Sequence, residues 1–209
     1  MRVSPDRPYA LTGGAVFTGE KLLYGQAVVI HGKTIHALLP ETSRAGDLLR
    51  VYVVGSVIAP GFIDLQLNGC GGVLFNDAIT SETLLTMHAA NRTTGCTSFL
   101  PTLITTSEHD MREAMAVVKD FRKGGRASAV PGLHPEGPYT SKERRGIHNA
   151  GAIKALTPGM RESLAAFAQT PPLMLTRAPE CRGPAHLRFP AAAGVGGSHG
   201  PRPRHCGDR

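Results

Sequence analysis

The feature that most constrains the fold is an alternation of strand-like and helix-like segments that begins after Pro60. The strand patterns are "GFIDLQL" (61–67), "TSFLPTLI" (97–104), "ASAVPGLHPEG" (127–137) and "PPLMLTRAPE" (171–180). Helical segments separate them: "SETLLTMHAANRTTG" (81–95), with Ser81 as the expected N-cap, "SEHDMREAMAVVKDF" (107–121) and "MRESLAAFAQ" (160–169). Strands that alternate with helices predict an α/β protein with a parallel sheet, either doubly wound or a (β/α) barrel. We expect the first of these strands to be buried.

The second helical segment carries the clearest periodic pattern in the chain. Its apolar residues fall on one helical stripe, and Ser107 stands at the expected N-cap. The stripe consists of Met111, Ala114, Met115, Val118 and Phe121. This face is predicted to pack on the core.

Residues 1–59 follow a different pattern of short β-rich runs separated by Gly and Pro, without a helical period. The run "AVVIHGKTIHAL" predicts a hairpin around His31-Gly32-Lys33. We therefore expect a small β-domain here, followed by the barrel-like segment 60–180.

Residues 181–209 fit neither pattern. Gly, Ala, Pro and Arg make up 19 of these 29 residues, which indicates either a disordered tail or translation in a shifted reading frame. The chain has a net charge of +7, but this segment holds five arginines and one acid, so the remainder has 18 basic and 15 acidic residues. The excess of positive charge therefore lies largely in residues 181–209. We expect no nucleic-acid partner.

The sequence also indicates in which cellular compartment the protein is expected. No stretch is apolar enough to span a bilayer, and the start "MRVSPDRPYALTGG" lacks the apolar core of a signal peptide. The four cysteines form no C-x-x-C pair, which fits reduced thiols. We expect a cytoplasmic protein without a membrane partner.

Two strands carry polar residues that could form a site. Asp64, Gln66 and Asn68 alternate along the first strand and therefore share a face, either as a solvated tip or as part of a site. His134 and Glu136 repeat this spacing at the end of the third strand, where parallel α/β folds build their active sites. Glu136 could hold a divalent metal there, whereas the alternative makes His134 a satisfied core histidine and Glu136 a loop cap.

The segment "KERRGIHNAGA" (142–152) follows directly and is basic. Its Lys142, Arg144 and Arg145, together with His148, could receive an anionic group such as a phosphate, or could form a solvated surface loop.

Five segments, "APGFIDLQLNGCGG", "GCTSFLPTLIT", "GLHPEGPY", "RRGIHNAGA" and "LTRAPE", occur in the order and at the spacing typical of one family. They resemble the N-acetylglucosamine-6-phosphate deacetylases of the amidohydrolase superfamily, from about residue 10 to Glu180. The resemblance implies a (β/α)8 barrel with a small β-sandwich built from both chain ends. Residues 1–59 would be part of the sandwich, and 60–180 would supply about four of the barrel strands.

The resemblance also implies a reaction, the metal-assisted hydrolysis of the acetamide of N-acetylglucosamine 6-phosphate to glucosamine 6-phosphate and acetate. Glu136 matches the family's metal-binding glutamate, and Ile147 and His148 match its substrate-contacting pair. Gln66 and Asn68 stand where many amidohydrolases carry H-x-H, which favours one divalent ion, with zinc preferred, over two. The family implies a homo-oligomer.

The family's two further metal-binding histidines and its catalytic aspartate are expected downstream of Glu180, so no catalytic base is identified and these residues alone are expected to be inactive. "AAAGV" followed by a histidine is similar to the family's next segment, which motivates the shifted-frame interpretation.

Three alternatives remain open at this point. The tail residues His199, His205 and Cys206 could complete a metal site with Glu136. The product could be a non-catalytic fragment that binds through its basic tail, for instance to nucleic acid. The substrate could also be another N-acetyl amino sugar.

Overall fold

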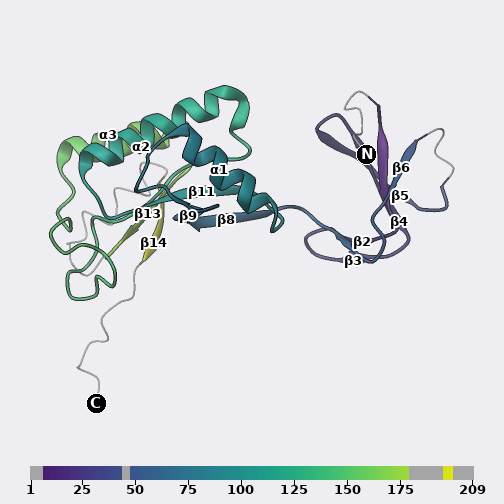
Figure 1. Ribbon diagram of the computed structural model, residues 1–209, viewed down its shortest axis with the longest axis horizontal. Coiled ribbons are helices and arrows are strands. Elements are labelled where there is room, and N and C mark those ends of the chain that lie inside the picture. The colour runs from purple at the N-terminus through teal and green to yellow at the C-terminus, as the bar shows by residue number, and fades with distance from the viewer. Residues whose placement is uncertain (1–6, 44–47, 179–194, 200–209) are drawn as a thin grey trace, which may run out of the picture. The chain divides into compact units, whose positions relative to one another are not determined.

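A computed structural model describes residues 7–43, 48–178 and the backbone of 195–199 (Figure 1). The chain divides into two compact units, residues 1–61 and 62–209, which are described separately below.

The first unit consists of short strands in two sheets. Its strands are β1 (Tyr9–Thr12), β2 (Ala15–Phe17), β3 (Leu22–Leu23), β4 (Gln26–His31), β5 (Thr34–Pro40), β6 (Leu49–Tyr52) and β7 (Val57–Ile58). One sheet has the order β5-β4-β1-β6, and the other has the order β3-β2-β7. The predicted hairpin is confirmed, because β4 and β5 pair antiparallel up to His31 and Thr34. Gly32 takes φ +60° in the connecting turn, a conformation that costs a residue without Cβ very little.

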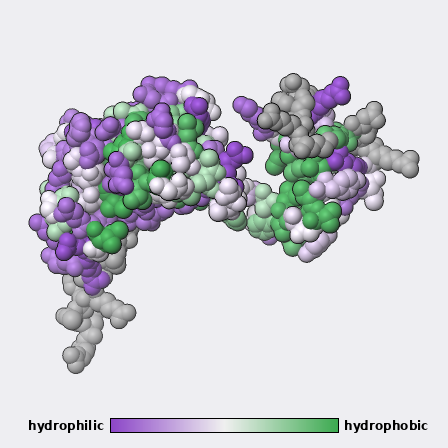
Figure 2. All heavy atoms as spheres, viewed as in Figure 1, coloured by the Kyte–Doolittle hydropathy of each residue, from purple (hydrophilic) through white to green (hydrophobic). Residues whose placement is uncertain are grey.

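The core of the first unit is small. Ala10, Ala27 and Val29 are almost fully buried and form a cluster. Other apolar side chains remain exposed, among them Ile35 at 74% and Val54 at 77%. Figure 2 shows hydrophobic residues gathered on the surface of this unit. Much apolar surface of these strands is therefore open to contact with other segments.

The second unit contains a parallel five-stranded sheet. It is formed by β8 (Phe62–Leu67), β11 (Cys96–Ile104), β12 (His134–Glu136), β13 (Leu173–Arg177) and β14 (Val195–His199). The order is β14-β13-β12-β11-β8, and every neighbouring pair is parallel. This confirms the predicted α/β class with a parallel sheet, while closure into a complete barrel stays a prediction. The strand β14 lies within the segment 181–209, whose other residues are outside the described part of the chain.

In the described residues, three helices connect these strands: α1 (Ser81–Arg92), α2 (Glu108–Phe121) and α3 (Pro158–Ala168). A π-helical turn, η1 (Arg122–Arg126), follows α2, and a short hairpin of β9 (Gly69–Cys70) and β10 (Val73–Leu74) precedes α1. The helices lie along one side of the sheet in Figure 1. Their apolar faces meet the sheet in one core that includes Leu84, Met87, Phe99, Leu103 and Phe167.

The helix α2 forms as its sequence predicts. Ser107 accepts a hydrogen bond from the Asp110 backbone N–H, and the Asp110 carboxylate accepts one from the Ser107 backbone N–H, which together make a capping box. All five residues of the predicted stripe are buried. For α1 the predicted cap is off by one residue, since Thr80 rather than Ser81 is the N-cap.

The strand β8 exists, but its predicted burial is wrong. Phe62, Ile63 and Leu65 are 68%, 62% and 53% exposed. In the described sheet β8 is the end strand and has one neighbour, β11, so its side chains lack cover from a further strand.

None of the described helices has the length and apolar character that crossing a bilayer requires.

Candidate active site

The candidate site is built at the carboxyl ends of neighbouring parallel strands. The register pairs Ile104 of β11 with Glu136 of β12, and Glu136 in turn pairs with Thr176 of β13. Because the strands run parallel, the residues that follow each of them emerge at the same edge of the sheet. This edge brings together residues far apart in the sequence.

Glu136 lies at the centre of this arrangement. Its side chain is partly buried, and its Oε1 accepts a hydrogen bond of 3.1 Å from Gln66 Nε2 of β8. The amide of Gln66 therefore orients a carboxylate that lies 70 positions away in the chain. A carboxylate with one oxygen so oriented keeps acceptor capacity for a cation or a further donor.

His148 approaches the same carboxylate from the loop that follows β12. Its Nε2 lies 4.0 Å from Glu136 Oε1, and its Nδ1 lies 2.7 Å from Thr105 Oγ1. The neighbouring Ile147 is 86% exposed and points no apolar surface into the core. Of the pair expected to contact substrate, His148 is held by Thr105 with its Nε2 near Glu136, and Ile147 lies on the surface.

His134 belongs to the core rather than to the open edge. It is 1% exposed; its Nδ1 lies 2.9 Å from the Leu65 carbonyl oxygen, and its Nε2 lies 2.8 Å from Thr176 Oγ1. The carbonyl can only accept, so Nδ1 carries the proton and Nε2 accepts from the threonine hydroxyl. Burial lowers the pKa of this imidazole, which favours the neutral ring. Of the two interpretations offered by the sequence, the geometry supports a satisfied core histidine.

Asn68, just after β8, carries a buried polar group that can still donate. Its Nδ2 has no hydrogen-bond partner in the described part of the chain. Asp64, at the other end of the alternating run, uses its Oδ1 to accept from the Gln66 backbone N–H at 2.9 Å. Gln66 and Glu136 are thus brought into contact, whereas Asp64 serves its own strand.

Sequence reasoning missed two residues that shape this edge. Thr105 forms hydrogen bonds with both His148 and the Glu136 carbonyl oxygen. Asn76 binds the end of β11 through hydrogen bonds of 2.8 and 2.9 Å to the backbone of Ile104. For Thr105, the sequence offers the polar run "TTS" (105–107) directly after an apolar strand. Such a run also occurs where an ordinary helix begins, so it does not indicate a site.

A family profile described as "NagA composite domain" matches residues 8–58. The N-acetylglucosamine-6-phosphate deacetylase of Haemophilus influenzae is 40% identical over 156 residues, which are 75% of this chain and 41% of the relative. An N-acetylgalactosamine-6-phosphate deacetylase of Shewanella sp. is 36% identical over 201 residues, or 93% of this chain and 50% of the relative.

Solved structures of the same type of deacetylase are also similar to this chain. The N-acetylglucosamine-6-phosphate deacetylase from Pasteurella multocida superposes with a TM-score of 0.85 at 36% identity, covering 92% of this chain and 50% of the other. Over 75–92% of its length, the chain is similar to N-acetylglucosamine-6-phosphate deacetylases. It spans about half the length of the relatives it matches.

The basic loop before His148 is a solvated segment at the described edge. Lys142, Arg144 and Arg145 are all exposed, and the Arg145 guanidinium donates to the His148 carbonyl oxygen at 3.5 Å. Of the three cations, Arg145 is placed beside His148 by this bond.

Potential metal ligands gather elsewhere. Among the described residues, one group of three has ligand atoms mutually within 4.8 Å: His109, Asp110 and Glu113 on α2. The carboxylate of Asp110 is already used in the α2 capping box, and His109 and Glu113 are exposed. This group has the features of a helix start, and Glu136 has no comparable set of protein ligands in the described part of the chain.

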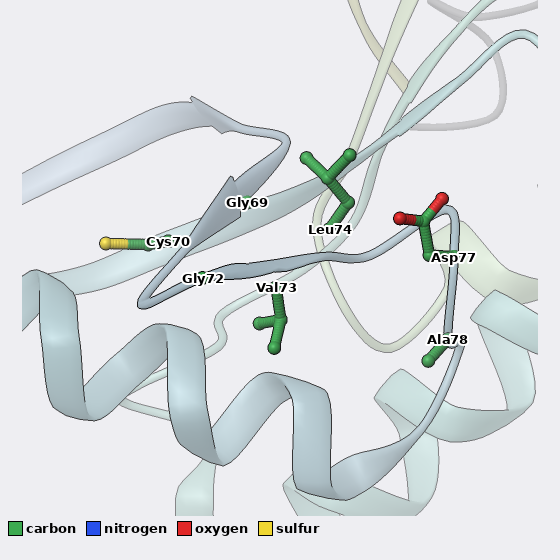
Figure 3. A pocket seen from close by; sticks show the side chains of 7 residues that line it. All are labelled: Gly69, Cys70, Gly72, Val73, Leu74, Asp77 and Ala78. Atoms are coloured by element: carbon green, nitrogen blue, oxygen red, sulfur yellow. The ribbon is translucent and has the colours of Figure 1, made fainter.

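A pocket of about 550 Å3 lies beside the β9–β10 hairpin (Figure 3). Val73 points toward α1, and Leu74 lies on the opposite side of the hairpin. The pocket is lined by Gly69, Cys70, Gly72, Val73, Leu74, Asp77 and Ala78, so it is separate from Glu136.

Proposed function

We propose that the protein serves the hydrolysis of the acetamide of N-acetylglucosamine 6-phosphate, which yields glucosamine 6-phosphate and acetate. The observation that carries this proposal is the convergence of Gln66 and His148 on the Glu136 carboxylate at the strand ends. The similarity to these deacetylases supports the reaction class, and the exposed Arg145, which bonds the His148 carbonyl oxygen, suits the phosphate.

Glu136 would hold one divalent metal ion, with zinc favoured. Carboxylate oxygen is a suitable ligand, and the Gln66 bond fixes its direction. The described residues supply one such ligand and not a complete coordination sphere, so further ligands would come from outside them. When bound, a divalent ion polarises the acetamide carbonyl and activates water.

The remaining roles are assigned to side chains at the same edge. His148 would contact the substrate through Nε2, and the buried, unpaired Nδ2 of Asn68 would donate to a group that enters the site. Gln66 would orient Glu136. We further propose that the protein works in the cytoplasm, consistent with the free thiols of Cys70 and Cys96, and that it forms a homo-oligomer as its family is expected to do.

The test measures binding and turnover separately on the purified chain supplied with Zn2+. Calorimetry with N-acetylglucosamine 6-phosphate is expected to show binding that is lost in Glu136→Ala and His148→Ala. Glu162→Gln, an exposed carboxylate on α3, is the matched control and should bind like the original chain. Equal binding by Glu136→Ala and the original chain would contradict the assigned site.

Acetate release decides whether the chain also turns the substrate over. Release above the Glu136→Ala level would mean that these residues, alone or as an oligomer, include a catalytic base. Binding without release fits the non-catalytic alternative, in which these residues bind the sugar but do not hydrolyse it.

A second candidate substrate is N-acetylgalactosamine 6-phosphate, because the Shewanella relative carries that activity in its name at 36% identity. Parallel titration with both sugars distinguishes them. Tighter binding of the galactosamine epimer would shift the assignment to it.

A further inference from the structure

We propose that Thr105 is a positioning residue that fixes the proton of His148 on Nδ1 and leaves Nε2 as the nitrogen that faces the substrate side. This inference rests on the proposed function for its catalytic meaning. Its structural content, the position of one proton, stands independently of any substrate or metal.

Thr105 directly follows β11 and is 8% exposed, so its hydroxyl has little access to water. Its Oγ1 lies 3.1 Å from the Glu136 carbonyl oxygen and 2.7 Å from His148 Nδ1. The single hydroxyl thus joins the backbone of β12 to the loop that carries His148.

The hydrogen-bonding capacity of these groups determines the direction of each bond. A carbonyl oxygen can only accept, so the one hydroxyl proton of Thr105 is donated to Glu136 O. The hydroxyl oxygen must then accept from His148, which requires a proton on Nδ1. This holds for the neutral and for the charged ring.

The consequence appears at the other nitrogen. In the neutral ring Nε2 carries the lone pair, and it lies 4.0 Å from Glu136 Oε1. Two acceptors at this distance do not bond each other, so Nε2 is open to a donor or a cation between them. Thr105 touches neither the carboxylate nor Nε2 and acts through the imidazole.

The backbone around Gly137 holds the hydroxyl in place. Gly137 has φ +96°, and a Cβ at this position would overlap Thr105 Oγ1. The hydroxyl is therefore packed against the β12 turn as well as bonded to it, so His148 meets a fixed acceptor.

The test observes the proton directly in the full 209-residue chain labelled with 15N-histidine. Long-range 1H–15N spectra are recorded well above the ordinary imidazole pKa of about 6.5, where the two neutral tautomers give different nitrogen shifts. The His148 signal is assigned by its loss in His148→Gln. The expected result is an Nδ1–H tautomer in the original chain and in Thr105→Ser, which keeps the hydroxyl.

Thr105→Val keeps the branched shape and removes the acceptor. It should move His148 toward the Nε2–H tautomer that imidazole favours in water. An Nε2–H ring in the original chain would overturn the proposal, and so would an unchanged Nδ1–H ring in Thr105→Val. If the valine variant fails to fold, the original chain and Thr105→Ser still decide the question.

Binding of N-acetylglucosamine 6-phosphate gives the functional readout. Thr105→Val should bind roughly five- to tenfold more weakly, the loss of about one hydrogen bond, and Thr105→Ser should be nearly unchanged. An Nδ1–H tautomer without sugar binding would leave the proton assignment intact and contradict the proposed function. Normal sugar binding by a valine variant with a switched tautomer would confine Thr105 to a structural role.

Discussion

At the scale of single residues, Gly137 is constrained twice, by a positive φ of +96° and by its contact with the Thr105 hydroxyl. Alanine there would meet both constraints. We expect Gly137→Ala to lower the free energy of unfolding by about 2–4 kcal/mol, the sum of a left-handed backbone cost and an overpacking cost. Urea unfolding measures it.

Gly146 provides the control for this prediction. It has φ +56°, and no atom lies within 4 Å of the place that a Cβ would occupy. Gly146→Ala therefore carries the backbone cost alone, about 1–2 kcal/mol. Equal losses in the two variants would show that the Thr105 contact does not matter.

The buried His134 is expected to stabilise the sheet. Its imidazole bonds Leu65 of β8 and Thr176 of β13, so it ties three strands together from a buried position. His134→Phe keeps an aromatic ring but removes both hydrogen bonds. It should cost about 2–4 kcal/mol, because the Leu65 carbonyl and the Thr176 hydroxyl each lose their bond to the imidazole. Thermal unfolding measures the loss. His88→Phe, which removes one longer bond of 3.3 Å at a half-buried site, should cost less than about 1 kcal/mol.

The same residue shows what the sequence could predict about the site. Alternation along a strand places His134 and Glu136 on one face, and that much is visible in "HPE". Which of them reaches a core partner depends on Leu65 and Thr176, which belong to other strands. Pairing between distant strands leaves no local pattern, so the two interpretations could be separated only by the structure.

At the scale of elements, the start of α2 contributes measurable stability. Ser107→Ala removes the bond to the Asp110 backbone N–H and should cost about 1 kcal/mol. Ser107→Asp, which preserves a capping oxygen, should stay near the original stability. A loss in the aspartate variant as large as in the alanine variant would exclude capping as the cause.

The pH dependence of this cap follows from Asp110. The Thr106 hydroxyl, followed by the Ser107 side chain and backbone, holds the pKa of the Asp110 carboxyl below its usual 3.8. The ionised form is favoured by folding, so its contribution is fully present above pH 3.8 and is lost as the pH falls through the lowered pKa. Unfolding of Asp110→Ala and of the original chain should therefore differ near neutrality and converge in acid. A constant difference across this range would contradict the assignment.

Helices and strands were predictable because their signals are local. Five apolar residues at helical spacing and a serine cap define α2, and a glycine between two β-rich runs defines the β4–β5 hairpin. The burial of β8 was not predictable in this way. Its apolar composition fits a covered strand, but cover requires a neighbour, and the described sheet provides one on a single side.

At the scale of the whole molecule, the chain covers 41% of the Haemophilus relative and 50% of the Pasteurella structure. The site likewise combines what these residues contain, Glu136 and His148, with ligands and a base that the proposal places outside the described part of the chain. The contact of His148 with Thr105 joins positions 43 residues apart and could not be read from either segment alone.

The exposed apolar side chains of β8 form a surface through which the chain can associate with itself. Prepared as these 209 residues, the protein should associate with itself through Phe62, Ile63 and Leu65, whose large apolar side chains remain more than half exposed on an end strand. Leu65→Lys should weaken this association by about tenfold or more, because a buried leucine contributes about 1.5–3 kcal/mol and an unpaired cation opposes burial.

Sedimentation velocity over a concentration series measures this association. Leu85→Lys on α1 is the matched control, since Leu85 is 43% exposed against 53% for Leu65 and lies on a helix rather than at the end of the sheet. If both lysine variants sediment like the original chain, the apolar side of β8 is not the contact. If only Leu65→Lys shifts toward monomer, the end strand is the surface that another segment of the protein, or a second copy of it, covers.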